Sequence, residues 1–232
     1  MEGLSGVKQS KLEILYEDNH ILVVVKPNNI LSQADSTKDL DLLTMLKQYI
    51  KEKYHKPGNV YLGLVHRLDR PVSGIMVFAR SSKAASRLSE QIRAHEFKKT
   101  YLAVVQGIPK KEDTFCDYLL KQENGNTIVT NEKYGKYSEL SYKVLESNKE
   151  KKLSLVEVFL KTGRHHQIRV QFSTRGHTLY GDSRYGMYDG KQIALHAYRL
   201  EFIHPVKKEK MIFIKMPDVK NEPWGLFNCV KS

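Results

Sequence analysis

Residues 60–79 read VYLGLVHRLDRPVSGIMVFA, in which two short apolar runs flank a polar connection. Such runs, rich in Val, Ile and aromatic residues, are typical of buried strands. We therefore expect the chain to leave one core strand and to enter another through the short loop HRLDRPVSG. That loop holds the carboxylate of Asp69 between the cations Arg67 and Arg70. The alternative is an ordinary solvated surface turn, which would have the same composition and whose ion pairs would contribute little to stability.

The charge balance favours a polyanionic partner. The chain has 38 Lys and Arg against 26 Asp and Glu, which gives a formal net charge of +12. This is lopsided for a generic soluble enzyme. Basic residues run from Lys8 to Lys231 without a low-complexity block, so the charge belongs to a folded surface. We expect nucleic acid as the partner. We do not expect a membrane surface, because no expected helix has a continuous basic face on one side and bulky apolar residues on the other.

The length of 232 residues allows one or two domains with a substantial core. We expect a single domain over residues 1–232, because no repeat and no Pro-, Gly- or Ser-rich linker divides the chain. Apolar stretches such as Ile21–Val25 are far shorter than the roughly 20 residues of a membrane-spanning helix. The N-terminus has no secretory apolar region, and Cys116 and Cys229 have no CxxC partner. Both features favour the cytoplasm.

Apolar periodicity predicts more strands than helices. Leucines at three- and four-residue spacing predict an amphipathic helix over residues 39–54, and the candidate caps Ser81 and Ser82 predict another over 83–96. Strands are expected over residues 12–16, 20–25, 101–105, 140–144, 153–160, 193–200 and 211–215. The pattern predicts an α+β fold with a mixed, largely antiparallel sheet and flanking helices. Residues 122–136, with several Asn and Gly, are expected to form a mobile surface insertion.

Three further clusters carry polar residues that a purely structural account does not need. KKTYLAVVQG at 98–107 is a strand with a basic start, in which Tyr101 can face either the core or a cleft. KTGRHHQIR at 161–169 begins a helix whose two arginines lie five residues apart and so point in different directions; a solvated basic helix start explains it equally well. GHTLYGDSRYG at 176–186 fits either a backbone approach to a ligand or an ordinary structured turn.

Other kinds of site lack their motifs. Nine histidines are present, but there is no HExxH motif and no Cys/His pair at zinc spacing, so we expect no metal site. The common nucleotide cradles GxxxxGK[ST] and GxGxxG are also missing, and we expect no cofactor. Ser73 and Gly74 match only part of the GxSxG motif that a serine hydrolase needs, and the full motif is missing.

In order and spacing, HRLDRPVSG, KKTYLAVVQG, KTGRHHQIR, GHTLYGDSRYG and LHAYRLEFIHP resemble the motifs of the RluA-type pseudouridine synthases of ribosomal and transfer RNA. The resemblance covers about residues 11–217 and implies the family's α+β domain, with a sheet bisected by the active-site cleft. Val72 departs from the family, which usually has Thr there, and so removes a hydroxyl near the catalytic loop. Only about ten residues precede the first expected strand, so we expect no N-terminal S4 module.

The resemblance also implies the chemistry. Breaking the N1–C1′ bond of uridine and joining C5 to C1′ calls for one ionised carboxylate against the sugar and a water-excluding pocket around the base. Asp69 matches the family's catalytic aspartate, Arg169 the arginine that pairs with it, and Tyr101 the tyrosine under the uracil ring. Arg67 matches the residue that enters the space left by the flipped base. Phosphate contacts are expected from four further cations, Arg70, Arg164, Lys98 and Lys99.

The resemblance thus predicts an enzyme that isomerises specific uridines in rRNA or tRNA. We expect it to be monomeric and free of cofactors, and we expect His66 to brace the loop. Two other classes stay open as alternatives. A non-catalytic RNA-binding protein of the same fold would have little reason to keep Asp69, Tyr101 and Arg169 together. A hydrolase of glycosidic bonds normally needs two carboxylates, and the loop has only one.

Overall fold

The computed structural model describes residues 12–37, 39–187 and 189–231. In this part of the chain, one sheet of 11 strands is accompanied by three α-helices and two short 3₁₀ helices. The strands are β1 (Glu13–Glu17), β2 (Ile21–Lys26), β3 (Gly63–Leu64), β4 (Ser73–Ala79), β5 (Lys98–Gln106), β6 (Glu112–Lys121), β7 (Thr127–Thr130), β8 (Lys136–Asn148), β9 (Leu153–Leu160), β10 (Leu195–Ile203) and β11 (Lys210–Ile214). The helices are α1 (Leu42–Lys53), α2 (Ser82–Arg93), α3 (Gln167–Ser173), η1 (Trp224–Leu226) and η2 (Asn228–Val230). None of the helices in the described residues has the length and apolar character needed to cross a membrane.

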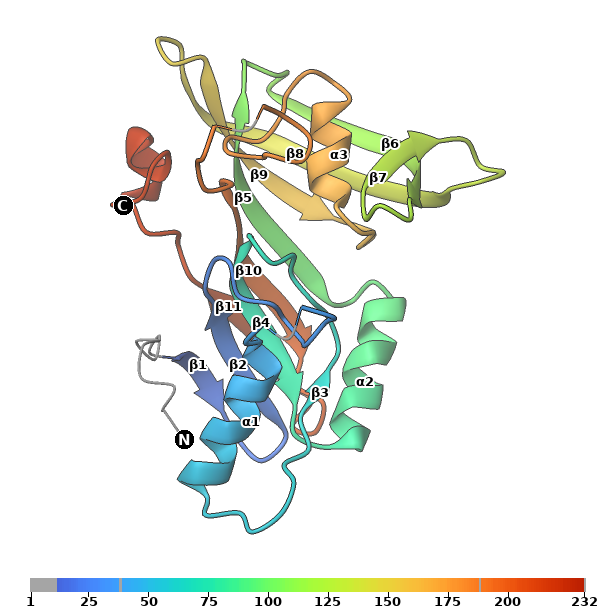
Figure 1. Cartoon of the computed structure of the whole chain (residues 1–232), viewed down its shortest axis with the longest axis vertical. Coiled ribbons are helices and arrows are strands. Elements are labelled where there is room, and N and C mark those ends of the chain that lie inside the picture. The colour runs from blue at the N-terminus through green and yellow to red at the C-terminus, as the bar shows by residue number, and fades with distance from the viewer. Residues whose placement is uncertain (1–11, 38, 188, 232) are drawn as a thin grey trace.

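The sheet is mixed and largely antiparallel. Its strands lie in the order β1-β2-β4-β10-β5-β9-β8-β6-β7, with β3 paired to β4 and β11 paired to β10. Every pair is antiparallel except β4 with β10. Figure 1 shows two halves, the first with α1 and α2 and the second with α3, and β5 runs from one half into the other. The predicted α+β class with a mixed, largely antiparallel sheet is confirmed.

The first half buries both faces of its sheet, which explains why β2 and β4 are apolar without interruption. Leu22 and Met76 point to one face and pack in the same core cluster as Leu46 of α1. Val23 points to the other face and packs in a second cluster with Leu88 of α2. Because successive strand residues point to opposite faces, the two helices cover opposite sides of the sheet.

Both long helices begin at polar caps. Asp41 accepts a hydrogen bond from a first-turn N–H of α1 at 3.0 Å, and Ser81 does the same for α2 at 3.2 Å. Each cap satisfies a helix donor that would otherwise lack a partner. The helices predicted over 39–54 and 83–96 are confirmed, the second with Ser81 as its cap.

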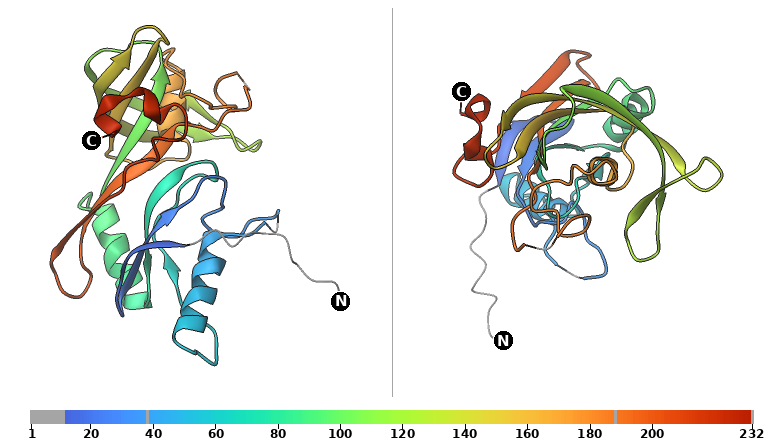
Figure 2. Two further views of the ribbon diagram at one scale, coloured as in Figure 1. Left: turned by 90° about the vertical axis from the view of Figure 1, so that its left-hand side faces the viewer. Right: turned by 90° about the horizontal axis from the view of Figure 1, so that it is seen from above.

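In the second half, the strands curve around α3, which Figure 2 shows nearly end-on in the hollow of the sheet. Phe172 of α3 packs against Phe115 of β6 and Tyr142 of β8, with ring centroids 5.1 and 5.0 Å apart. A helix of only seven residues is unstable in isolation. The aromatic packing therefore holds α3 in place, and with it Arg169.

Two predicted segments differ in the structure. The apolar run 60–65 forms a strand only at Gly63–Leu64, because β4 ends at Ala79, the partner of Gly63, and the N–H of Val77 donates to the side chain of His66. The segment 122–136 is not a surface insertion throughout. It contains β7, which pairs with β6 and brings Thr127 to 2% exposure.

Candidate active site

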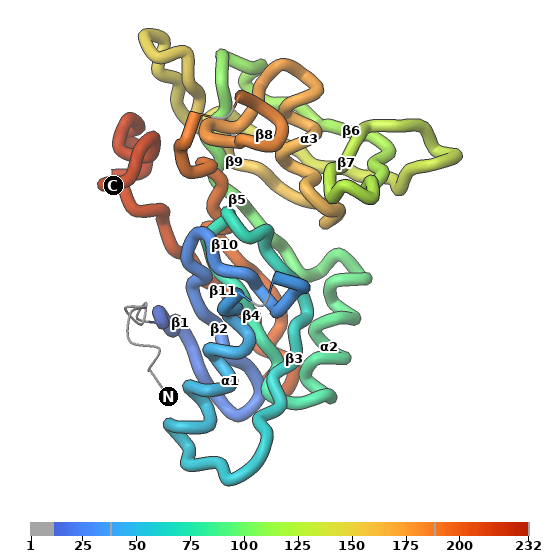
Figure 3. Tube along the Cα trace, in the orientation of Figure 1, coloured from blue at the N-terminus to red at the C-terminus, as the bar shows by residue number. Residues whose placement is uncertain are grey.

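The HRLDRPVSG loop between β3 and β4 is held by three side-chain donors from other parts of the chain and by one N–H group of its own. Four consecutive carbonyl oxygens, from Leu68 to Pro71, each accept a hydrogen bond. The donors in order are Ser32 Oγ at 2.7 Å, Val72 N at 3.0 Å, Lys26 Nζ at 2.9 Å and Gln192 Nε2 at 2.6 Å. Figure 3 traces this loop along the edge of the first half that faces the second half. Because Val72 is buried and the carbonyls are all paired, the loop is fixed without the hydroxyl of a Thr.

Lys26, the last residue of β2, anchors the loop from within the protein. The residue is fully buried, and its ammonium group donates to the carbonyl oxygens of Pro27, Ile30 and Arg70 at 3.0, 2.6 and 2.9 Å. Burial lowers the pKa of Lys26 to about 7, and the charge of Asp69 opposes that shift. The three carbonyl acceptors also favour the charged form. Lys26 thus places a buried cation beneath the loop that carries Asp69.

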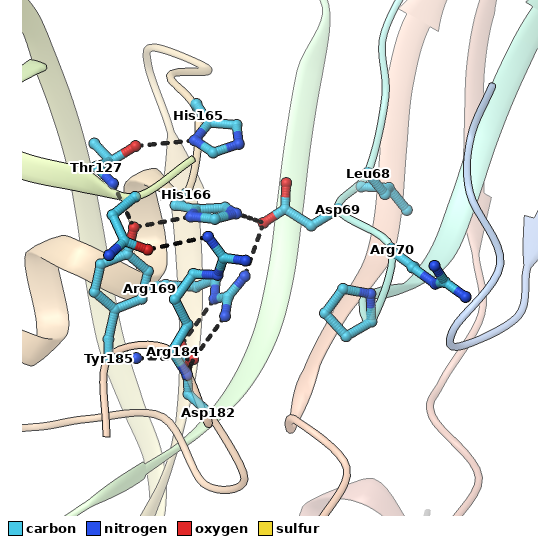
Figure 4. A network of polar contacts seen from close by, with 12 residues as sticks. Leu68, Asp69, Arg70, Thr127, His165, His166, Arg169, Asp182, Arg184 and Tyr185 are labelled. Carbon is cyan, nitrogen blue, oxygen red and sulfur yellow. Dashed lines mark hydrogen bonds and ion pairs between the residues drawn. The ribbon is translucent and has the colours of Figure 1, made fainter. Parts of the chain in front are cut away.

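The Asp69 carboxylate reaches from this loop toward the residues that lead into and form α3 (Figure 4). Its Oδ2 lies 3.5 Å from Nη1 of Arg169 and 3.6 Å from Nε2 of His166. Across the described residues, the other oxygen, Oδ1, takes part in no hydrogen bond or ion pair. One oxygen is therefore held between two nitrogen groups, and the other is available to a substrate.

Arg169 forms its closer ion pair with Asp182, a residue that the sequence analysis did not select. Nε and Nη2 of Arg169 donate to the two oxygens of Asp182 at 2.8 and 2.6 Å. The predicted pairing of Arg169 with Asp69 is therefore present only as the longer of two contacts, and the bidentate contact goes to Asp182. Burial is the largest single influence on Arg169 and lowers its pKa, but the hydrogen bonds to Asp182 and the charges of Asp182 and Asp69 together outweigh it, so the pKa of Arg169 is raised. The sequence signal that could have identified Asp182 is that it is the one acidic residue of the loop 176–186.

A second set of contacts connects His166 with β7, and it too was missed from sequence. Nδ1 of His166 lies 2.8 Å from the hydroxyl of Tyr185, which accepts a hydrogen bond from the backbone N–H of Thr127 at 2.8 Å. The Thr127 hydroxyl lies 2.9 Å from Nδ1 of His165, and the two histidine rings stack with centroids 3.7 Å apart. Burial and, next, the charge of Arg169 lower the pKa of His166 to about 2, so its ring is neutral.

A cavity of about 80 Å³ lies beside Asp69. Val72, Ile168 and Leu195 form apolar parts of its wall, and Tyr101 of β5 lines it at 6% exposure. Burial raises the pKa of Tyr101, and the charge of Asp69 raises it further, so the phenol keeps its proton at neutral pH. The cavity is lined by six of the predicted site residues: Asp69, Tyr101, Arg169, Arg67, Lys99 and Arg164.

Two larger grooves adjoin this cavity, and Arg67 lines all three. The groove of about 770 Å³ includes Lys98 and Arg164, and the groove of about 440 Å³ includes Arg70. Arg67 is exposed and forms no hydrogen bond or ion pair with the described part of the chain. Arg70, by contrast, pairs with Asp39 at 2.7 Å. The cations predicted to contact phosphate therefore lie on both sides of the cavity.

His66 joins the start of the loop to β4. Its Nε2 accepts a hydrogen bond from the N–H of Val77 at 3.1 Å, and its ring packs edge-on against Phe97 with centroids 5.2 Å apart. Burial, with the charge of Lys99, lowers the pKa of His66 to about 3. The neutral ring is an acceptor for β4, which agrees with the bracing role expected from sequence.

Asp69, His165 and His166 bring three potential metal ligands together. The geometry does not suit one ion, because the two rings are stacked at an interplanar angle of 28° and nitrogen lone pairs lie in the ring planes. Lone pairs in nearly parallel planes do not converge on a metal at bonding distance. Arg169 also places a competing positive charge 3.5 Å from Asp69. The arrangement suits a hydrogen-bonded carboxylate better than a metal centre.

Comparisons with known proteins identify the family of the chain. The family described as RNA pseudouridylate synthase matches residues 20–174. The uncharacterized RNA pseudouridine synthase YhcT of Bacillus subtilis is 35% identical over 91% of this chain and 71% of its own length. Ribosomal large subunit pseudouridine synthase C of Buchnera aphidicola is 34% identical over 88% of this chain and 66% of its own length. The structure of human RNA Pseudouridylate Synthase Domain Containing 4 shares the fold, with a TM-score of 0.74 at 22% identity over 88% of each chain. The chain therefore belongs to the RNA pseudouridylate synthase family, as the RluA-type resemblance of its motifs predicts.

Proposed function

We propose that the chain isomerises uridine to pseudouridine in ribosomal RNA, with Asp69 as the catalytic group. The observation that carries the proposal is a single carboxylate on a small cavity, with a buried arginine beside one oxygen and the other oxygen unpaired. A glycosidase would need a second carboxylate, and Asp69 is the only acidic residue among those that line the cavity. The ribosomal substrate is inferred from relatives named for the large ribosomal subunit.

The reaction needs no redox change. The N1–C1′ bond breaks, the C5–C1′ bond forms, the hydrogen on C5 leaves, and N1 gains one. In this proposal Oδ1 of Asp69 meets the sugar, either by adding to C1′ or by removing a sugar proton. Arg169 and His166 lie against Oδ2, where the positive guanidinium favours the ionised carboxylate.

Tyr101 and the apolar wall suit the detached uracil. A phenol ring stacks on a base without regard to its hydrogen bonds, and the buried side chains of Val72 and Leu195 exclude water from the base. The Tyr101 hydroxyl, which stays protonated, can pass a proton on while C5 loses its hydrogen. We assign the uracil base to this cavity and the flanking phosphates of the RNA to the two grooves that adjoin it.

Access to C1′ and C5 requires the nucleotide to leave its stack, at a cost of a few kcal/mol. Arg67, exposed and unpaired within the described residues, is placed to fill the gap with its planar guanidinium. Lys98 and Arg164 on one side, and Arg70 on the other, would contact the flanking phosphates. All of these groups come from one chain, so a monomer suffices.

Tritium release tests the proposed function. RNA labelled with tritium at C5 of uridine is prepared from cells that lack the chain and is incubated with the purified protein, without added metal or nucleotide. We expect tritium to appear in water, with no free uracil and no strand scission. Free uracil or shortened RNA would instead indicate a hydrolase, and binding without any release would indicate a non-catalytic RNA-binding protein.

A further inference from the structure

We propose that Tyr185 is a positioning residue that holds His166 in one tautomer, so that a neutral Nε2–H is presented to Asp69. The proposal rests on the proposed catalytic role of Asp69. It concerns residues outside the predicted site and assigns a task to a hydroxyl that lies one side chain away from the cavity.

The directions of the hydrogen bonds follow from the backbone donor together with the single proton of the Tyr185 hydroxyl. The N–H of Thr127 can only donate, so the oxygen of Tyr185 is the acceptor in their 2.8 Å contact. Among the described residues, the other hydrogen bond of this hydroxyl is the contact with Nδ1 of His166, 2.8 Å away, so we assign the hydroxyl proton to that contact. Nδ1 is thereby an acceptor, and in a neutral imidazole the other nitrogen, Nε2, must carry the hydrogen. Nε2 is the atom that lies 3.6 Å from Oδ2 of Asp69.

The surroundings of His166 fix its ring in this orientation. The residue is 9% exposed and stacks on His165, whose Nδ1 contacts the Thr127 hydroxyl at 2.9 Å. Its backbone has a φ of 51°, in the left-handed region that residues other than Gly rarely adopt. Its side chain does not cap α3, although it occupies the cap position. Strain of this kind persists where the surroundings over-determine the conformation, and it is frequent at functional sites.

Two donors of different kinds thus converge on one oxygen of Asp69. Arg169 supplies a full positive charge, and His166 supplies a neutral N–H. Both distances are slightly long, as is common before a substrate closes the site. Together they direct the remaining oxygen, Oδ1, toward the substrate, and the neutral donor does so without adding charge near the developing positive centre at C1′.

Tyr185→Phe tests the proposal in the full chain. With uridine-5-tritiated RNA and excess enzyme, we expect the limiting single-turnover rate of tritium release to fall roughly tenfold, the order of effect of one lost hydrogen bond. The enzyme concentration for half-saturation should change less than about twofold, because Tyr185 contacts no predicted phosphate site. Tyr180→Phe is the matched control, since its hydroxyl bonds Glu222 at 3.3 Å, away from the cavity, and its rate should match the wild type. Equal rates for Tyr185→Phe and wild type would overturn the proposal.

Two substitutions of His166 separate positioning from stability. The amide of His166→Gln can place an N–H near the position of Nε2, whereas the shorter amide of His166→Asn cannot. Asn tolerates the left-handed backbone at least as well as Gln, so His166→Asn should have the higher melting temperature. The rate of tritium release should instead be higher for His166→Gln. A rate order that followed the stability order would indicate a purely structural role.

A spectroscopic readout does not depend on activity or on any variant that might misfold. Long-range ¹H–¹⁵N correlation spectra of the histidine-labelled wild type distinguish a protonated imidazole nitrogen from an unprotonated one. We expect His166 to carry hydrogen on Nε2 alone at pH 7. Hydrogen on Nδ1, or on both nitrogens, would overturn the proposed positioning of His166 by Tyr185 even if the enzyme releases tritium. Absence of tritium release with the expected tautomer would instead count against the proposed function.

Discussion

Arg169 is shared unequally between two carboxylates, with Asp182 as its close partner. Nε and Nη2 donate to Asp182 at 2.8 and 2.6 Å, and Nη1 lies 3.5 Å from Asp69. The side chains of Arg169 and Asp182 are 5% and 0% exposed. Asp182 is held in turn by the N–H groups of Arg184 and Tyr185 at 3.0 and 3.3 Å. This arrangement fixes the guanidinium independently of Asp69, so the carboxylate that we propose as catalytic can change its bonding without losing its cation.

Arg169→Met should destabilise the protein and abolish tritium release. The substitution leaves the buried carboxylate of Asp182 without its partner, and breaking such a pair costs about 3 to 5 kcal/mol. Urea unfolding monitored by circular dichroism measures the stability.

The double variant Arg169→Met/Asp182→Leu separates the two consequences. An apolar pair in place of a buried ion pair is often neutral, so much of the lost free energy of unfolding should return. Activity should stay absent, because Asp69 still lacks its cation. A double variant that regained activity would show that Asp69 does not need Arg169, and one that stayed as unstable as Arg169→Met would show that the unpaired Asp182 is not the cause.

Asp69→Asn should abolish isomerisation and leave RNA affinity within about a few fold. Asn keeps the shape of the side chain but lacks the negative charge that the sugar step needs. Because Asp69 is partly exposed and forms no close hydrogen bond, stability should change little. Tritium release and filter binding measure the two effects, and turnover by the purified variant would remove Asp69 from the catalytic role.

The elements that could be predicted from sequence are those with a local signal. β2 and β4 are uninterrupted apolar runs because both of their faces are covered, and α2 has a serine cap. β7 is not predicted, although its four β-branched residues, TIVT, are typical of a strand, because the Asn and Gly residues before them indicate a loop. The shortness of β3 depends on the end of β4 at Ala79 and on the His66 side chain, which accepts the N–H of Val77.

The residues of the site also divide into those that the sequence predicts and those that only the fold reveals. Asp69, Tyr101 and Arg169 each lie in a distinctive motif, and the structure places all three on one cavity. The role of Asp182 depends on a turn at Gly181, which has a φ of 71° and lies against the backbone of Gln192. Periodicity does not encode such a turn, so the residue could not be assigned before the fold was known.

Tyr101→Phe should slow tritium release and leave RNA binding unchanged, because the ring still stacks on uracil but the hydroxyl is lost. Burial raises the pKa of Tyr101, so the phenol is protonated throughout the neutral range. The ratio of wild-type to variant rates should therefore be the same at pH 7 and at about pH 9. A ratio that grew with pH would indicate an ionised phenolate as the base. Tyr142→Phe, another buried tyrosine, is the control and should keep the wild-type rate.

Mild acid should destabilise the fold through three histidines. Burial is the leading cause that lowers the pKa of His66 to about 3, of His166 to about 2 and of His196 to about 4, from an ordinary 6.5. Below pH 6.5 the unfolded chain binds protons that the native state does not, so the free energy of unfolding falls as the pH falls. The slope approaches about 1.4 kcal/mol per pH unit for each histidine.

Urea unfolding between pH 7 and about pH 4.5 measures this slope, in a window above the range where most carboxylates titrate. His196→Gln should reduce the slope by the share of one histidine, whatever its effect on stability at pH 7. The control His55→Gln removes an exposed histidine and should leave the slope unchanged. A free energy of unfolding that did not vary over this window would contradict the neutral state of the three rings.

RNA affinity should depend steeply on salt, because phosphate contacts release counterions from the RNA. With about six contacts, affinity should fall by about a thousandfold between 50 and 200 mM salt. Lys98→Gln removes an exposed cation of the larger groove and should reduce the slope of log affinity against log salt by about one. Lys149→Gln, an exposed cation in the turn between β8 and β9, is the matched control and should keep the wild-type slope. Because both variants lose the same charge, equal slopes for the two would show that net charge, and not the groove beside Asp69, attracts the RNA.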